Sequence, residues 1–325
     1  MAGSTSLLRS FVRLNGSLKD LKPERDRYRQ YASQAREFIL RETERHCDEF
    51  LDRPIQPLLD GFSSLAERSS IRLISLNYDD LPLKSNIKFT TGFVDAKESF
   101  QIFRPSIPWP DDCHIWCQLH GSVLFRVKSM SELGEYEIVR YRNRVDAAAQ
   151  EWIHDIYWPR YPDRHQSPLS PIITGLRKAD AIQEEPYASY AHVFREEALS
   201  CDRWLIIGYS GGDRHINSVL SHARTHWRRS GRKHRVVIVT YWDFEDLLPP
   251  PNLGTLVFDP EFDEVSYRTL SLIGEESVED IRDSMDTVLW PSNLWRVSDT
   301  FALTGDGVDW AMGPGLRDIM EFLGI

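Results

Sequence analysis

The sequence lacks the features of a membrane protein or an exported protein. Hydrophobic residues make up 41% of its 325 residues, yet no apolar run approaches the roughly 18 residues that a membrane-spanning helix needs. The stretch Met1–Asp20 has a short apolar patch but no signal-peptide core followed by a cleavage site. Charged residues account for 27%, which is typical of an ordinary globular chain and not of a disordered one. We therefore expect a soluble protein of the cytoplasm.

Cysteine is scarce, and the few cysteines are poorly spaced for metal binding. The four residues, Cys47, Cys113, Cys117 and Cys201, do not form the paired C-x-x-C sets of a structural zinc ribbon. Cys113 and Cys117 have His114 nearby and could in principle touch a metal. However, Cys117 lies in the apolar run HIWCQL, where a buried thiol is the commoner case. We expect no zinc and no disulfide bonds.

The chain also lacks the excess of positive charge that is typical of DNA-binding proteins. Its net charge is -10, from 39 basic and 49 acidic residues, whereas proteins that hold DNA through phosphates are usually basic. One basic cluster, RTHWRRSGRKHR, runs from Arg224 to Arg235. We interpret it as a solvated helix end and loop, so direct contact with nucleic acid is not expected.

The first half of the chain predicts helices followed by short strands. Apolar residues at helical spacing predict helices at 22–48, 54–67 and 144–156. Five short runs between Leu83 and Tyr141 are bounded by turn residues and predict β-strands: IKFTTGF, SFQIFR, HIWCQLHG, SVLFRVK and EYEIVRY. A proline-rich connection follows at 157–171, and we interpret this loop as a possible gate or oligomer contact.

The second half contains the clearest pattern. A helix at 186–200 is followed by a strand at 203–208, a glycine turn, a helix at 213–228 and a strand at 235–241. Strand, turn, helix and strand in this order predict a βαβ unit, and strands apolar on both faces belong to a covered parallel sheet.

The strand Ile71–Leu76 fits the same sheet, so the predicted fold class is α/β, a doubly wound Rossmann-like parallel sheet with helical additions at both ends. We divide the chain into an N-terminal helical segment of the core domain at 1–70, the core at 71–245 and a C-terminal cap at 246–325. The cap is rich in Asp, Glu and Trp, and we expect it to be of mixed helical structure.

Three polar signatures follow predicted strands. They are SLNYDD after the first strand, QLHGS after HIWCQL, and GYSGGD after RWLIIG. Because ligands of open parallel sheets bind outside the carboxyl ends of the strands, these signatures predict a nucleotide site. Taken singly, Asn77 and Asp79 could close a turn, His120 could be a structural histidine, and GYSGGD could be a simple connection.

Together these motifs resemble the sirtuin family, in particular its prokaryotic branch found in antiphage defence systems. The resemblance covers residues 71–241. The residues that carry it are Ser75–Asp79, His120–Gly121 and Leu205–Asp213, with weaker support from Pro171–Lys178 and Glu185–Tyr187.

The resemblance implies chemistry on NAD, with Asn77 and His120 as catalytic residues. Asn77 matches the family asparagine beside the nicotinamide ribose, and His120 matches the histidine that acts as general base through ribose hydroxyls. An asparagine can order a water molecule and a hydroxyl without carrying charge, and a histidine titrates near neutral pH, as a base requires. Asp79 would orient Asn77 or a ribose hydroxyl.

The resemblance also implies a cofactor-binding turn. Its residues match Gly208, Tyr209, Ser210, Gly211 and Gly212, whose backbone N–H groups would approach a ribose or phosphate at a helix N-terminus. Thr240 matches the position that contacts the adenosine half. Asp213, a carboxylate, is interpreted as the N-cap of the following helix.

The family's opening strand with its Gly-Ala-Gly loop has no counterpart here beyond Gly3 and Ser4. Three explanations are open: a truncated start, another segment in its place, or loss of catalysis. The missing zinc ribbon favours a small-molecule NAD hydrolase over a protein deacylase.

We expect an NAD hydrolase that acts as a defence effector, with a homo-oligomer or a defence-system protein as partner. The alternatives are a catalytically inactive domain that senses NAD or ADP-ribose or acts as a scaffold and, third, a deacylase.

Overall fold

The computed structural model divides the chain into two compact units. Unit 1 consists of Met1–Arg53 and Ser70–Phe194, and unit 2 of Pro54–Ser69 and Arg195–Ile325. The residues that the structure describes are 22–51, 55–96, 99–105, 109–110, 112–129, 136–150, 171–173, 182–209, 211–239, 294–296, 301–304 and 307–325.

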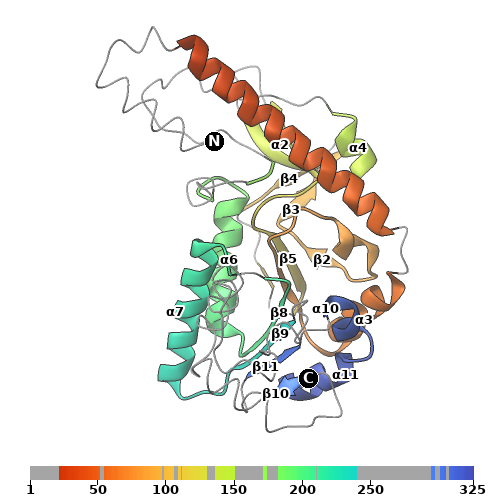
Figure 1. Ribbon diagram of the computed structural model, residues 1–325, viewed down its shortest axis with the longest axis vertical. Helices are drawn as coiled ribbons and strands as arrows, with labels where there is room; N and C mark the ends of the chain where they lie inside the picture. Colours follow the sequence, from red (N-terminus) through yellow and green to blue (C-terminus); the bar gives the residue numbers. More distant parts are fainter. Residues whose placement is uncertain are drawn as a thin grey trace, which may run out of the picture. The chain divides into compact units, whose positions relative to one another are not determined.

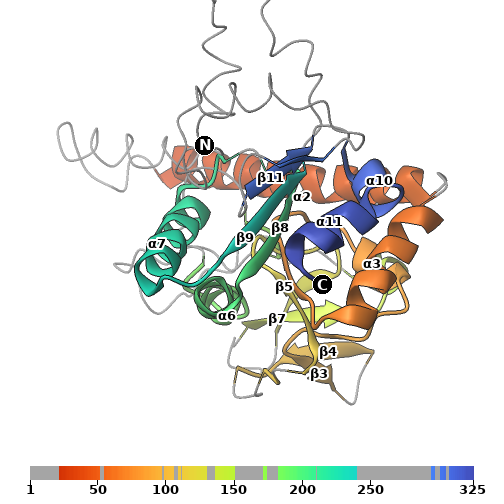
Figure 2. The same cartoon turned by 90° about the horizontal axis from the view of Figure 1, so that it is seen from below.

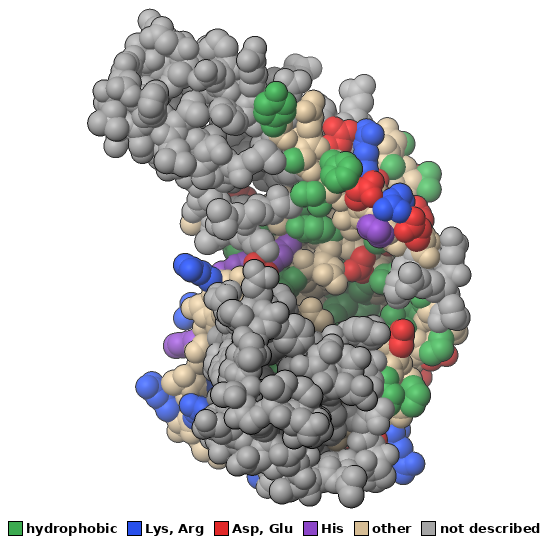
Figure 3. Space-filling model, viewed as in Figure 1, with side chains coloured by type: hydrophobic (Ala, Val, Ile, Leu, Met, Phe, Trp, Pro, Cys, Tyr) green, Lys and Arg blue, Asp and Glu red, His purple; other side chains and the backbone are tan. Residues whose placement is uncertain are grey.

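The longest helix of unit 1 is α2 (Lys22–Leu51), which confirms the helix predicted at 22–48 (Figure 1). Glu44 of α2 forms an ion pair of 2.9 Å with the buried guanidinium of Arg126. Charged side chains of both signs gather along the exposed surface of α2, where Arg45 pairs with Glu42 at 2.8 Å (Figure 3). Neither α2 nor any other helix in the described part of the chain has the length and apolar content that crossing a bilayer requires.

The short helix α4 (Arg144–Ala148) lies beside α2 and covers the first residues of the helix predicted at 144–156 (Figure 1). Asn143 caps it by accepting a hydrogen bond from the backbone N–H of Asp146. Residues 151–156 lie outside the described residues.

Unit 1 contains a small parallel sheet with the strand order β1-β5-β2. It is built from β1 (Arg72–Ser75), β5 (His114–Gln118) and β2 (Phe89–Thr90). The central strand β5 is almost entirely buried, as its apolar sequence predicts. The register pairs Arg72 with Ile115 and Ser75 with Gln118, so the two longer strands end together.

Unit 1 also contains an antiparallel sheet with the strand order β3-β4-β7-β6. Its strands are β3 (Phe93–Asp95), β4 (Phe100–Phe103), β7 (Tyr136–Tyr141) and β6 (Phe125–Ser129). Aromatic side chains fill its buried face: the ring of Phe93 lies 5.3 Å from that of Phe103 and 5.1 Å from that of Phe125. Each of the five predicted strand segments between Leu83 and Tyr141 thus contains a strand.

Unit 2 is built around the predicted βαβ unit. It consists of β8 (Arg203–Ile207), α7 (Arg214–Ser230) and β9 (Arg235–Val239), and the two strands pair in parallel (Figure 2). The helix α6 (Tyr187–Ser200), which confirms the helix predicted at 186–200, precedes β8, and the boundary between the units falls inside it. The indole N–H of Trp227 on α7 donates to the carbonyl of Ala198 on α6 at 3.1 Å.

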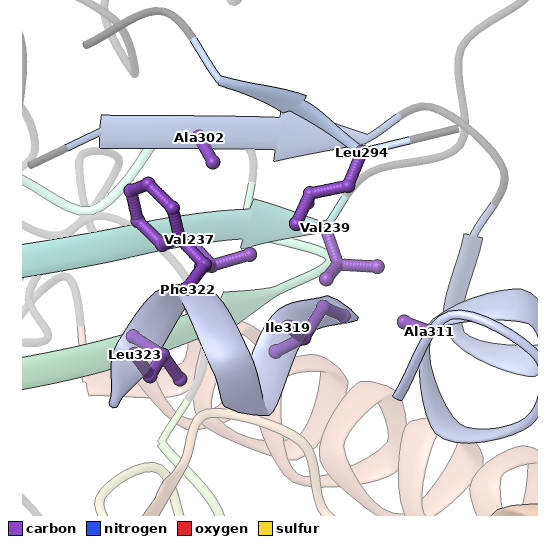
Figure 4. Close-up of a cluster of buried hydrophobic side chains, with 8 residues drawn as sticks. All are labelled: Val237, Val239, Leu294, Ala302, Ala311, Ile319, Phe322 and Leu323. Carbon is purple, nitrogen blue, oxygen red and sulfur yellow. The ribbon is translucent and has the colours of Figure 1, made fainter. Parts of the chain in front are cut away.

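The end of the chain completes the sheet of unit 2. The strands β11 (Phe301–Thr304) and β10 (Trp295–Arg296) extend it to the order β10-β11-β9-β8, with β11 parallel to β9. The predicted helical cap therefore includes two strands of the sheet besides α10 (Gly307–Met312) and α11 (Leu316–Leu323). The side chains of α11 pack with those of β9 and β11 in one buried cluster (Figure 4): Val237, Val239, Leu294, Ala302, Ala311, Ile319, Phe322 and Leu323.

The helix α3 (Gln56–Arg68) belongs to unit 2, although it precedes β1 in the chain. It packs against α10, where a Cβ atom at Gly61 would lie 2.2 Å from the backbone oxygen of Met312. Only glycine permits this close approach of the two helices. The helix predicted at 54–67 is thus confirmed, and its partner comes from the far end of the chain.

The parallel strands of the described residues form two sheets and not one. The sequence predicted that strand 71–76 shares a sheet with strands 203–208 and 235–241, but β1 pairs with β5, and β8 pairs with β9, in separate sheets. An apolar run shows that a strand is covered on both faces, but it does not identify the neighbouring strand. The mixed α/β class is confirmed, and a doubly wound sirtuin-like arrangement remains a proposal.

The basic cluster Arg224–Arg235 covers the end of α7 and the loop that follows. Arg228 and Arg229 lie in the last helical turn, where positive charge is favourable beside the carbonyl end of the helix. Gly231 ends the helix in the left-handed conformation, with φ of 65°. Figure 3 shows Lys and Arg side chains along this edge of the molecule. The structure of the cluster agrees with a solvated helix end.

His234, just before β9, is buried between two tryptophan rings. It stacks on Trp227 at 5.4 Å between ring centroids and meets the edge of Trp204 at 4.2 Å. Neither ring nitrogen has a hydrogen-bond partner among the described residues. The pKa of His234 is lowered from 6.5 to about 4, chiefly by burial and also by the positive charge of Arg224, while Asp202 opposes the shift.

We predict that His234 destabilises the protein in mild acid. Above pH 6.5 the ring is neutral in both the folded and the unfolded state and contributes no pH dependence. Below pH 6.5 the unfolded chain binds the proton first, so stability falls until the pH reaches the lowered pKa of about 4. His234→Phe keeps the aromatic packing and should remove about 2 kcal/mol of the stability difference between pH 7 and pH 5.

Urea unfolding of wild type and variant at both pH values measures this difference. His222→Gln, which changes an exposed histidine of α7, is the control and should behave as wild type. An undiminished loss of stability at pH 5 in His234→Phe would show that other groups cause it.

Candidate functional site

The register of β1 and β5 brings the two predicted catalytic residues to the same edge of one sheet. Ser75 is paired with Gln118, and the backbone N–H of Leu119 donates to the carbonyl of Ser75 at 3.0 Å. Asn77 and His120 each follow two residues after this last pair. Because the strands are parallel, both residues emerge at the carboxyl edge, where open sheets bind ligands.

Asn77 lies on an exposed turn after β1. The Ser75 hydroxyl accepts a hydrogen bond from the N–H of Asn77 at 3.2 Å, which stabilises the turn. The carboxylate of Asp79 accepts from the N–H of Leu81 at 3.1 Å and from the Asn77 side chain. Asp79 thus closes a turn, and its carboxyl group also interacts with the Asn77 side chain; a role in orienting Asn77 for catalysis remains a proposal.

The pKa of the Asp79 carboxyl is raised from its usual 3.8. Burial is the main cause, and the hydrogen bond from Leu81 opposes it. The neighbouring carboxylate of Asp80 raises the pKa further. Asp80 is 3% exposed and forms an ion pair of 3.2 Å with Arg144. Two adjacent carboxyl groups therefore lie in different environments beside the candidate site.

His120 is only 1% exposed and lies in a tight turn after β5. Gly121 has φ of 96°, and a Cβ atom there would lie 2.1 Å from the carbonyl oxygen of Pro171. Gly121 and Ile172 form an antiparallel bridge. The segment Pro171–Ile173 thus runs directly against the His120 turn, and glycine after His120 is a steric requirement.

The glycine turn of unit 2 connects β8 to α7. Gly208 donates its N–H to the carbonyl of Val239 at 2.9 Å and has φ of 62°, and no atom of the described residues lies within 4 Å of a Cβ built on it. Gly211 also has a positive φ, of 71°, and Gly212 is exposed. The backbone is therefore open to a ligand at Gly208. Ser210 and Thr240 lie outside the described residues.

Asp213 is the N-cap residue of α7, as predicted, but its side chain makes no capping hydrogen bond to the helix. The turn is instead held by Asn217, which the sequence interpretation missed. The Asn217 side chain donates to the carbonyl of Gly211 at 2.6 Å and accepts from the hydroxyl of Tyr209. Burial raises the pKa of Tyr209 well above its usual 10, so its hydroxyl stays a donor. These contacts reach back six and eight residues along the chain, so they do not follow the three- and four-residue spacing of a helix, and the sequence pattern gives no signal for them.

Two weaker motifs, Pro171–Lys178 and Glu185–Tyr187, also carry the resemblance, and the structure describes only part of the first. Pro171–Ile173 is described and contacts the His120 turn, whereas Thr174–Lys178 lies outside the described residues. Tyr187 is 1% exposed and begins α6. Cys117 is fully buried in β5, as its apolar surroundings predict, and Cys113 is a partly exposed free thiol.

No protein-family model matches the chain, and a search of curated proteins finds no match either. The function therefore has to be inferred from the residues of the candidate site and their chemistry.

We predict that Asn217→Ala loosens the turn between β8 and α7. The substitution removes two part-buried hydrogen bonds of the Asn217 side chain, and a typical hydrogen bond contributes about 0.5–1.5 kcal/mol to stability. Hydrogen exchange in 208–213 should accelerate, and the free energy of unfolding should fall. Ser218→Ala changes the adjacent exposed residue and should leave both quantities as in wild type. Unchanged exchange in Asn217→Ala would assign the stability of the turn to its backbone alone.

Proposed function

We propose that the protein binds NAD and hydrolyses it to nicotinamide and ADP-ribose. The observation that carries this proposal is the register of β1 and β5, which brings Asn77 and His120 to one carboxyl edge within unit 1. An amide and an imidazole at such an edge suit the cleavage of a glycosidic bond to a cationic base. The order of the motifs, which resembles that of sirtuins, suggests NAD as the substrate.

The chemistry requires two tasks of the protein. When the bond between nicotinamide and ribose breaks, its electron pair leaves with nicotinamide, and positive charge develops on the ribose. The oxygen of water then bonds to this carbon and gives up a proton. His120 would accept the proton through a ribose hydroxyl, and the neutral amide of Asn77 would hold the hydroxyl and the water in place. The carboxylate of Asp79 orients Asn77 and favours the developing positive charge.

In unit 2, we propose that the turn after β8 contacts ribose or phosphate. Positive φ values at Gly208 and Gly211, and the open space beside Gly208, favour close approach of a ligand to the backbone. The first N–H groups of α7 follow directly and favour an anion.

One observation favours a second candidate, a domain that senses NAD or ADP-ribose without turnover. His120 is 1% exposed, and a general base has to reach its substrate. If the protein is a hydrolase, unregulated loss of NAD would harm the cell that makes it. We therefore propose, in line with a defence effector, that a partner protein or self-association controls the activity.

We predict that Asn77→Ala and His120→Gln each reduce nicotinamide release from NAD by at least about 100-fold, the range expected for loss of a general base. Glutamine retains a polar side chain of similar size at position 120, which limits damage to the buried turn. Chromatographic measurement of nicotinamide from the purified protein tests this directly.

Two variants serve as matched controls. Asn86→Ala and His192→Ala change an exposed asparagine and an exposed histidine of the same unit and should retain wild-type release. Full activity in both Asn77→Ala and His120→Gln would overturn the assignment. Thermal stabilisation by NAD without release would favour the sensor, and release that requires an acetylated peptide would favour a deacylase.

A further inference from the structure

A ring of three hydrogen bonds, closed by the backbone from 120 to 123, connects Tyr78, the residue after Asn77, with the turn that carries His120. The hydroxyl of Tyr78 donates to the carbonyl of Ile173 at 2.9 Å. The N–H of Ile173 donates to the carbonyl of His120 at 2.7 Å, and the N–H of Val123 donates to the carbonyl of Tyr78 at 2.8 Å. The ring therefore joins the residue next to Asn77 with the turn that carries His120.

Only one link of this ring depends on a side chain. The bonds from Ile173 to His120 and from Val123 to Tyr78 join backbone groups, which no ordinary substitution removes. Replacing Tyr78 by phenylalanine removes the hydrogen bond from the hydroxyl but keeps the aromatic side chain and its packing. The hydroxyl is thus the single point at which this connection can be tested.

The surroundings make the ring rigid. Ser122 donates its N–H to the carbonyl of Pro171 at 3.2 Å, and Gly121 leaves no space for a Cβ atom against the same residue. Burial raises the pKa of Tyr187 well above 10, with Tyr78 adding to the shift, so Tyr78 borders a poorly solvated region. Hydrogen bonds in such surroundings are stronger than in water.

We propose that Tyr78 is a positioning residue that sets the place of His120 relative to Asn77 by anchoring the backbone of Ile173. This inference rests on the proposed NAD hydrolysis for its catalytic consequence. The hydroxyl of Tyr78 does not act on the substrate. It fixes the segment Pro171–Ile173, which in turn holds the carbonyl of His120. Small misplacements of a catalytic group can reduce a rate by up to about 100-fold.

Tyr78→Phe in the full chain tests this role. We expect kcat for nicotinamide release to fall at least about 10-fold with KM for NAD unchanged, because the substrate contacts remain while the base is displaced. Hydrogen exchange of the backbone at 119–123 should accelerate, and this second measurement does not depend on activity.

Tyr190→Phe is the matched control. Tyr190 also belongs to unit 1 and is buried, and its hydroxyl donates to the carbonyl of Thr91 at 2.7 Å, outside the ring. Both variants lose one hydrogen bond from a tyrosine hydroxyl to a backbone carbonyl, and because the bond of Tyr190 is the more buried of the two, Tyr190→Phe should lose at least as much stability as Tyr78→Phe. Tyr190→Phe should keep wild-type kcat and wild-type exchange at 119–123.

The outcomes separate this inference from the proposed function. If wild type releases nicotinamide and Tyr78→Phe matches it in kcat and in exchange, the positioning role is overturned. Equal loss of kcat in both variants would also overturn it, since general destabilisation would then be the cause. If wild type releases no nicotinamide, the proposed function fails, and the catalytic consequence of Tyr78 fails with it. Hydrogen exchange then still tests the structural part: unchanged exchange at 119–123 in Tyr78→Phe would show that Tyr78 does not hold the His120 turn.

Discussion

The candidate site depends on one continuous buried segment of unit 1. Every residue from Ile115 to Val127 is buried, and four of them, Gln118, His120, Ser122 and Arg126, are polar or charged. Burying such groups is costly unless they are hydrogen-bonded. The guanidinium of Arg126 donates to the carbonyls of Val123 and Phe125 at 2.9 Å and 2.8 Å, and the Ser122 hydroxyl accepts from the N–H of Leu124 at 3.2 Å. The turn that carries His120 is thus held by contacts that surround it.

The other side of the site is built differently. Asn77 is exposed, and its loop is anchored by Asp80, which pairs with Arg144. Arg144 also donates to the carbonyl of Glu44 at 3.0 Å, so α2 supports the loop from outside the sheet. A fixed, enclosed imidazole and an accessible amide are thus combined at one edge. In the proposed hydrolase the amide would meet the ligand, whereas the enclosed imidazole would keep a fixed position.

The individual helices and strands were predictable from the sequence, whereas the elements that pair or pack with each of them were not. The apolar runs at β5, β8 and β9 and the helical spacing in α2 and α7 identify these elements because burial requires those patterns. Two contacts join segments that are distant in the chain: β11 pairs with β9, and α3 packs on α10. The division of the parallel strands into two sheets likewise depends on which distant strands pair. A pattern of burial shows that a face is covered but carries no information about what covers it.

The same contrast holds within the candidate site. The glycine turn of unit 2 is held by Asn217 of the helix that follows it, six residues after Gly211, so its support is local in the chain. The His120 turn is held by Tyr78 and Ile173, which lie on segments far away in the chain. A turn that carries its own support tolerates change elsewhere. The His120 turn is contacted by residues 78 and 171–173, so substitutions at those distant positions are expected to alter it. The candidate site is therefore best described as the NYD, HG and PII segments together, and a chain that kept His120 but lost either of these contacts would retain the motif without this geometry.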